Sequence, residues 1–148
     1  MRILTAAALL APLLLSPPVL AESYYGKQKV VYHVNTAGGE ADKAYLMTLT
    51  NVQNHINAVG KDNVEVKIVM HGDGVGLVKD AKSNMDVQAK VMNLKDQKVA
   101  FLVCENTLKG RKIDADRDLF DVDKGDIVPS GVAELSRLQQ QGYTYIRP

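Results

Sequence analysis

Apolar residues follow two different spacings along this chain, one typical of strands and one typical of helices. Between residues 42 and 59 they recur at every third or fourth position, which places one apolar stripe on a helix that Gly60 ends. Weaker stripes predict further helices over 86–94 and, with Ser130 as the cap, over 132–138. Alternating or continuous β-rich runs predict five strands, at 29–34, 64–70, 99–103, 127–128 and 143–146.

Strands and helices alternate along the whole chain, so we predict an α/β fold with a mostly parallel sheet and helices on both faces. The polar and apolar alternation over 64–70 favours a position nearer a sheet edge than the other strands occupy. The run 99–103 is continuously apolar, as in strands that are covered on both faces. We predict glycine-rich turns at 36–39 and 71–76, and irregular structure over the aspartate-rich segment 112–126.

The first 21 residues have the pattern of a cleaved secretory signal. Arg2 precedes an almost wholly apolar stretch, and small or modest side chains stand just before Glu22, at Val19, Leu20 and Ala21. We therefore predict a signal peptide at 1–21, a single domain at 22–148, a periplasmic location and no membrane association after cleavage. An uncleaved membrane anchor is the alternative, although the prolines near its end would weaken a spanning helix.

Charge and loop chemistry exclude several classes of function. The formal net charge is +1 and falls to about zero when Arg2 is removed, which gives no electrostatic reason to expect nucleic acid as a partner. The first glycine-rich loop lacks the G-x-G-x-x-G spacing, neither loop matches a P-loop, and acidic residues nearby would repel phosphate. Asp114, Asp116 and Asp118 imitate the start of a calcium loop, but Leu119 stands where glycine is needed. We expect no cofactor and no metal.

Cys104 is the only cysteine, and it ends the most apolar predicted strand. A helix that begins at about Asn106 would favour the thiolate, which is the nucleophilic form. Lys109 and Arg111 would add positive charge, while Glu105 would oppose it. The alternative is a buried cysteine that behaves as a small hydrophobic residue.

The carboxyl ends of parallel strands form the ligand-binding edge of open α/β sheets, so we place the candidate site there. His71 ends the second predicted strand and could act as a base or cationic partner for Cys104, or could be structural; His33 and His55 are weaker candidates. The remaining candidate pocket residues lie in the loops at the same edge: Asn35, Gly38, Gly39, Gly72, Gly74, Asn106, Thr107 and Ser130.

Three segments resemble the DsrE/DsrF-like family. FLVCENTLKGR (101–111) carries a cysteine–any–asparagine–threonine pattern, IVPSGVAELSRLQQQGYTYIRP (127–148) resembles the closing strand–helix–strand unit, and HGDGVGLV (71–78) is a looser match. The resemblance implies a three-layer α/β/α fold with a five-stranded, mostly parallel sheet. It also implies assembly into oligomers and, as in some members, sulfur carried as a persulfide on the cysteine at position 104.

We therefore expect a sulfur-handling protein in which Cys104 accepts sulfane sulfur and passes it to a partner in a sulfur relay, and a homo-oligomer. Sulfur carriage of this kind does not decide whether the protein also turns over as a free enzyme. Two alternatives stand beside it: a non-catalytic oligomeric module that binds a small ligand or a protein, with Cys104 packed and inert, and a redox sensor that forms an intermolecular disulfide.

Overall fold

The computed structural model describes residues 24–148, and the predicted signal peptide at 1–21 lies outside this range. The strands of this part of the chain form one sheet in the order β4-β3-β2-β1-β5, and every neighbouring pair is parallel. The strands are β1 (Gln28–Val34), β2 (Val64–Met70), β3 (Ala100–Cys104), β4 (Ile127–Val128) and β5 (Thr144–Ile146). The predicted α/β fold with a five-stranded parallel sheet is confirmed.

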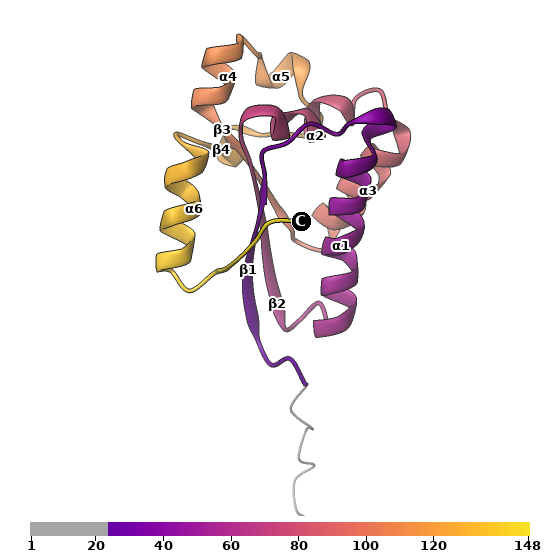
Figure 1. Cartoon of the computed structure of the whole chain (residues 1–148), viewed down its shortest axis with the longest axis vertical. Helices are drawn as coiled ribbons and strands as arrows, with labels where there is room; N and C mark the ends of the chain where they lie inside the picture. Colours follow the sequence, from indigo (N-terminus) through magenta and orange to yellow (C-terminus); the bar gives the residue numbers. More distant parts are fainter. Residues whose placement is uncertain (1–23) are drawn as a thin grey trace, which may run out of the picture.

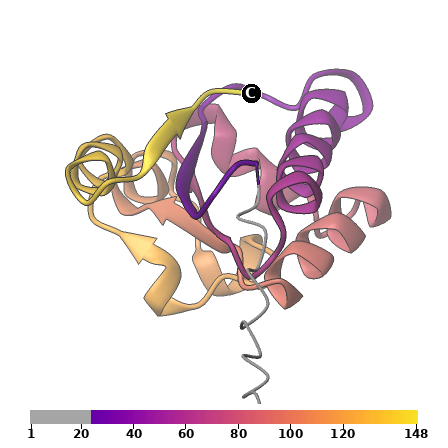
Figure 2. The same ribbon diagram turned by 90° about the horizontal axis from the view of Figure 1, so that it is seen from below.

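Helices cover the two faces of the sheet unequally (Figures 1 and 2). One face carries α1 (Lys43–Val59), α2 (Gly76–Asp80) and α3 (Met85–Asp96), and the other carries α6 (Gly131–Gln140). The short helices α4 (Glu105–Arg111) and α5 (Ala115–Asp118) lie beyond the carboxyl ends of the strands. Single 3-10 turns occur at η1 (Glu40–Asp42), η2 (Gly72–Val75) and η3 (Lys124–Asp126). Within residues 24–148, no helix combines the length and the apolar character needed to cross a bilayer.

The apolar core is correspondingly divided by the sheet. The larger part lies under α1, α2 and α3, where Tyr45, Ile68 and Phe101 are all at most 2% exposed. The smaller part lies under α6 and consists of Val31, Val69, Leu102, Leu135, Leu138 and Tyr143. Because α6 is only ten residues long, or about 15 Å, it covers only part of the strands on its face.

The prediction that β2 lies near a sheet edge is wrong, because β2 is the central strand, with β1 and β3 on its two sides. Its polar positions have a different cause. Glu65 and Lys67 belong to the α6 face, where their side chains stay 51% and 25% exposed. Tyr143 contacts both: its hydroxyl donates to Glu65, and the Lys67 ammonium lies 5.1 Å from the Tyr143 ring centroid. The edges are formed by β4 and β5, which are very short, as edge strands often are.

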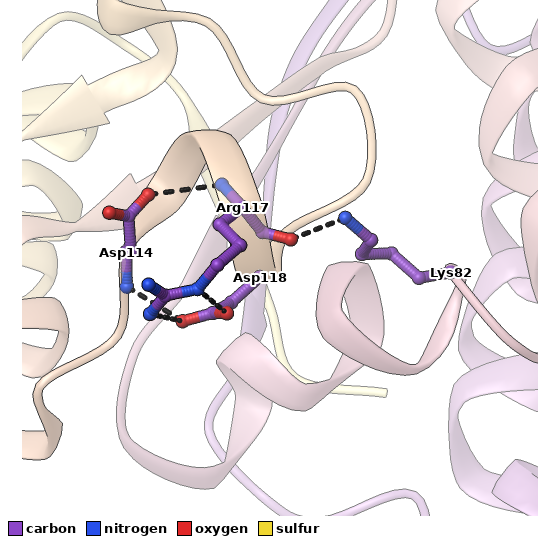
Figure 3. Close-up of polar contacts among 4 residues, drawn as sticks. All are labelled: Lys82, Asp114, Arg117 and Asp118. Carbon is purple, nitrogen blue, oxygen red and sulfur yellow. Dashed lines mark hydrogen bonds and ion pairs between the residues drawn. The ribbon is translucent and has the colours of Figure 1, made fainter.

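Two segments contain more helix than the sequence pattern predicts. The glycine-rich segment 71–76 forms η2 and the start of α2. In the aspartate-rich segment, Asp114 caps α5 by accepting from the Arg117 amide at 3.0 Å, and the Asp118 carboxylate accepts from the Arg117 side chain at 3.0 Å (Figure 3). The Lys82 ammonium donates to the Arg117 carbonyl, which ties α5 to the end of α2. The Asp114 and Asp118 carboxylates thus have a local structural role in capping and bracing α5.

We predict that Leu138→Ala lowers the free energy of unfolding by about 2–5 kcal/mol, because Leu138 is 0% exposed in the smaller core. Val132→Ala on the same helix is the matched control: its side chain is 64% exposed, so the change should stay within about 0.5 kcal/mol. Urea denaturation measures both. Equal effects would show that α6 does not contribute to a packed core.

Candidate functional site

Cys104 is the last residue of β3, and α4 begins at the next residue. Side chains two apart on a strand share a face, so Cys104 lies on the same face as Leu102, which packs under α6. The register pairs Cys104 with Val128 of β4, and the chain enters α6 three residues after Val128. Strand pairing therefore brings the first turn of α6 next to the cysteine.

Gly131, the first residue of α6, lies close to this site. A Cβ added there would lie 3.2 Å from the Cβ of Cys104 and 3.0 Å from the Cβ of His71. Both distances are tighter than nine in ten real Cβ contacts. Glycine at this position therefore lets the helix backbone approach both residues without displacing them.

The pKa of the Cys104 thiol is lowered although its side chain is only 5% exposed. Burial acts in the opposite direction and raises the pKa, because it disfavours the charged thiolate. Hydrogen bonding from the Gly131 amide, the Thr107 hydroxyl and amide, and the Asn106 amide outweighs burial. The thiol is thus placed between the first turns of α4 and α6, where unpaired amides favour an anion.

Thr107 also connects this cysteine to the loop after β2. Its hydroxyl accepts from the Gly72 amide at 3.0 Å, which leaves its proton free to face the thiol. The expected positive charge from Lys109 and Arg111 is not delivered to the thiol. Lys109 pairs with Glu105 at 2.9 Å, and Arg111 pairs with Asp73 at 2.7 Å.

His71 lies beside Cys104 at the ends of neighbouring strands, since Met70 pairs with Val103 in the β2–β3 register. Its Nε2 atom is 2.7 Å from Nε2 of His33, and Nδ1 of His33 is 2.6 Å from the Tyr145 hydroxyl. Burial lowers the pKa of His71, and burial followed by the charges of His71 and Arg147 lowers that of His33. Both shifts favour the uncharged form of the imidazole.

A cavity of about 630 Å³ opens between α6 and this group of side chains. His33, His71 and Tyr145 line it from the sheet. From α6 it is lined by Val132, Leu135, Ser136, Gln139 and Gln140. The cavity combines apolar walls with a few convergent polar groups, as small-molecule sites do.

The other predicted pocket residues do not all meet at Cys104. Gly38 and Gly39 line a second cavity of about 490 Å³ beside α1 and α2, together with Tyr45 and Asp80. Burial and the nearby Asp80 carboxylate raise the pKa of Tyr45 to about 12, so its hydroxyl keeps its proton at neutral pH.

The three remaining predicted pocket residues are Ser130, Gly74 and Asn35. Ser130 caps α6 by accepting from the Ala133 amide, and Gly74 packs so closely that an added Cβ would lie 2.0 Å from the Val34 carbonyl oxygen. The Oδ1 atom of Asn35 is buried and, within residues 24–148, is the one such side-chain nitrogen or oxygen atom without a hydrogen-bond partner. Asn35 lines neither of the two cavities described above.

Sequence reasoning gave no role to Tyr145 and Gly131, and it ranked His33 behind His71. Their placement depends on strand order and on the packing of α6, which the sequence pattern does not contain. The sequence does contain a partial signal for the placement of His33. His33 and Val31 are two residues apart on one strand, so their side chains must share a face. In the described part of the chain, no three histidine, cysteine or acidic side chains are grouped so that they could hold a metal ion.

Comparisons with known proteins agree with the fold. The model of the DsrE/DsrF-like family matches residues 28–148. The structure of a protein of unknown function from Methanobacterium thermoautotrophicum, MTH1491, is 31% identical and superposes with a TM-score of 0.69, covering 82% of this chain and 100% of that chain. The curated proteins gave no match.

We predict that Gly131→Ala lowers the free energy of unfolding by about 1–3 kcal/mol, because the new methyl group overlaps His71 and Cys104. Gly110→Ala is the control: it lies in α4 with nothing within 4 Å of an added Cβ, and should be stabilising by about 0.5–1 kcal/mol. Urea denaturation again provides the measurement. A Gly131→Ala protein as stable as the parent would contradict the close packing of α6 on the site.

Proposed function

Because this chain belongs to the DsrE/DsrF-like family, we propose that it is a sulfur-handling protein in which Cys104 accepts sulfane sulfur as a persulfide and relays it. The observation that carries the proposal is the lowered pKa of a cysteine located between the first turns of two helices. The thiolate is the form that attacks sulfur, and the same amides would stabilise the persulfide anion that results.

The transfer conserves atoms and electrons. The Cys104 thiolate attacks the outer sulfur of a persulfide or polysulfide, a new S–S bond forms, and the S–S bond of the donor breaks. The donor thiolate leaves with the bonding electron pair and takes up a proton. In the second step the thiolate of an acceptor attacks the outer sulfur on Cys104, and the Cys104 thiolate is regenerated. No external oxidant or reductant is consumed.

The low exposure of Cys104 restricts the donor. At 5% exposure the thiol has little room for direct docking of a protein surface, which favours a small polysulfide or low-molecular-weight persulfide for loading. The bound outer sulfur then lies about 2 Å beyond the cysteine sulfur, which extends the reach of a recessed side chain toward an acceptor.

Location and assembly belong to the same proposal. The signal-peptide pattern at 1–21 supports a periplasmic site of action. Membership of the family supports a homo-oligomer and a partner protein that receives the sulfur. The near-zero charge expected after loss of Arg2 is compatible with such protein contacts and gives no support to binding of nucleic acid.

One observation favours a second candidate function. The same 5% exposure suits a non-catalytic oligomeric module that binds a small ligand or a protein and in which Cys104 is packed and inert. That candidate predicts a thiol that resists reagents in the folded protein and reacts only after unfolding.

We predict that incubation of the purified protein with polysulfide adds whole sulfur atoms to its intact mass, that reductant reverses the gain, and that Cys104→Ser abolishes it. The lone cysteine makes this comparison unambiguous. A mass that does not change in the folded parent protein, together with a thiol that reacts only in denaturant, would reject the sulfur-carrier function and support the inert module.

A further inference from the structure

The cavity under α6 is separate from the cysteine, because Cys104 is not among the side chains that line it. Its volume of about 630 Å³ falls within the range of about 300–1,000 Å³ that is usual for small-molecule sites. Its polar groups come from three side chains of the sheet and three of α6: His33, His71 and Tyr145, and Ser136, Gln139 and Gln140. These groups define which class of ligand the cavity accepts.

The wall of this cavity offers no counter-charge. Among residues 24–148, no acidic, lysine or arginine side chain lines it. Burial lowers the pKa of both of its imidazoles, which favours their uncharged forms. Arg147 acts on His33 from beyond β5 but is not part of the lining. A charged ligand would therefore lose hydration without gaining an ion pair, which costs free energy.

The cavity beside α1 and α2 shows the contrast. Five charged side chains line it: Asp42, Asp73, Lys79, Asp80 and Arg111. A ligand that carries charge finds partners of either sign there. The uncharged lining under α6 is thus a property of that one site and not of the whole surface near the strand ends.

The sheet side of the cavity ends in a hydroxyl with unused hydrogen-bonding capacity. Both ring nitrogens of His33 have partners, with Nε2 of His71 at 2.7 Å and the Tyr145 hydroxyl at 2.6 Å. A tyrosine hydroxyl has one donor and two acceptor positions, and His33 uses one of them. Whichever of the two groups donates, the Tyr145 hydroxyl keeps a position for a ligand.

The α6 side supplies donors and acceptors without charge. The Gln139 amide nitrogen donates to the Leu135 carbonyl at 3.1 Å, and the Gln140 amide nitrogen donates to the Ser136 hydroxyl oxygen at 3.4 Å. Each carboxamide keeps its oxygen and one N–H for other partners, and the Ser136 hydroxyl keeps its proton. These groups suit a ligand that can both donate and accept hydrogen bonds.

The cavity also has an exposed apolar part. Val132 is 64% exposed and Tyr145 is 40% exposed, although both are large apolar side chains, and both line this cavity. They come from different elements, α6 and β5. Covering them with an apolar group removes their surface from water, which is favourable.

We propose that the cavity under α6 is a binding site for a small uncharged ligand that has an apolar body and an amide-type group able to donate and accept hydrogen bonds. The uncharged lining selects the neutral molecule over charged molecules of the same shape. This inference goes beyond sulfur carriage, because the site does not include Cys104.

The test compares three probes of nearly the same shape and different charge: benzamide, benzoate and the benzamidinium ion. Each is titrated at pH 8 into the purified protein, and histidine ring signals are followed by NMR. The chain has three histidines, and His55 is the internal reference because it is bonded to Tyr32 on the opposite face of β1. Ring signals are assigned with His33→Gln and His55→Gln.

We expect benzamide to shift the His33 and His71 signals, with saturation at about millimolar concentration for so small a probe, and to leave His55 unshifted. Benzoate and benzamidinium should bind at least about fivefold more weakly, because neither finds a counter-charge.

Two variants test the polar and the apolar contacts. Tyr145→Phe should weaken benzamide binding about fivefold through loss of one hydrogen bond. Val132→Ala should weaken it about threefold through loss of apolar contact, at a position where stability changes little. Tyr32→Phe is the matched control, and its affinity for benzamide should equal that of the parent protein.

The proposal is overturned if benzamide gives no saturable shift of His33 and His71, if either charged probe binds as tightly as benzamide, or if Tyr145→Phe binds benzamide as the parent does. Failure of this site and failure of sulfur carriage are distinguishable. Cys104→Ser should bind benzamide like the parent protein while it loses sulfur loading, since the titration contains no sulfur compound and the cysteine does not line the cavity.

Discussion

The contact between the first residue of α6 and the ends of β2 and β3 is the constraint on which the site depends. Gly131 has no side chain, so the helix backbone can rest against His71 and Cys104 at once. This contact brings the Gly131 amide to the thiol, and it closes the smaller core through Leu135 and Leu138 further along the helix. A substitution that moved the helix outward would therefore affect both the stability of that core and the ionisation of the cysteine.

The unequal cover of the sheet explains where polar groups can gather. Three helices bury one face, whereas a single short helix covers the other and leaves space beside it. His33, His71 and Tyr145 occupy this space as a hydrogen-bonded group, and the cavity keeps one end of the group open to solvent. Neutral histidines tolerate such a half-buried position, since both ring nitrogens of His33 have partners.

Sequence patterns predicted the elements well, because the period of apolar residues reports which faces are buried. They could not give the position of β2, because its polar residues Glu65 and Lys67 lie on the face that only α6 covers, where they contact a distant tyrosine and stay partly exposed to solvent. For the same reason the sequence identified Cys104 but not its neighbours. The roles of Gly131 and Tyr145 arise from strand order and helix packing, both of which bring together residues far apart in the chain.

The central claim is that the helix starts outweigh burial and hold Cys104 as a more acidic thiol than usual. The most direct measurement is the ultraviolet titration of the thiolate in the folded protein and in the urea-unfolded protein, each with Cys104→Ser as the blank. A lowered pKa in the folded state predicts a lower midpoint for the folded protein than for the unfolded one. A folded midpoint equal to or above the unfolded midpoint, as burial alone would produce, would contradict the account.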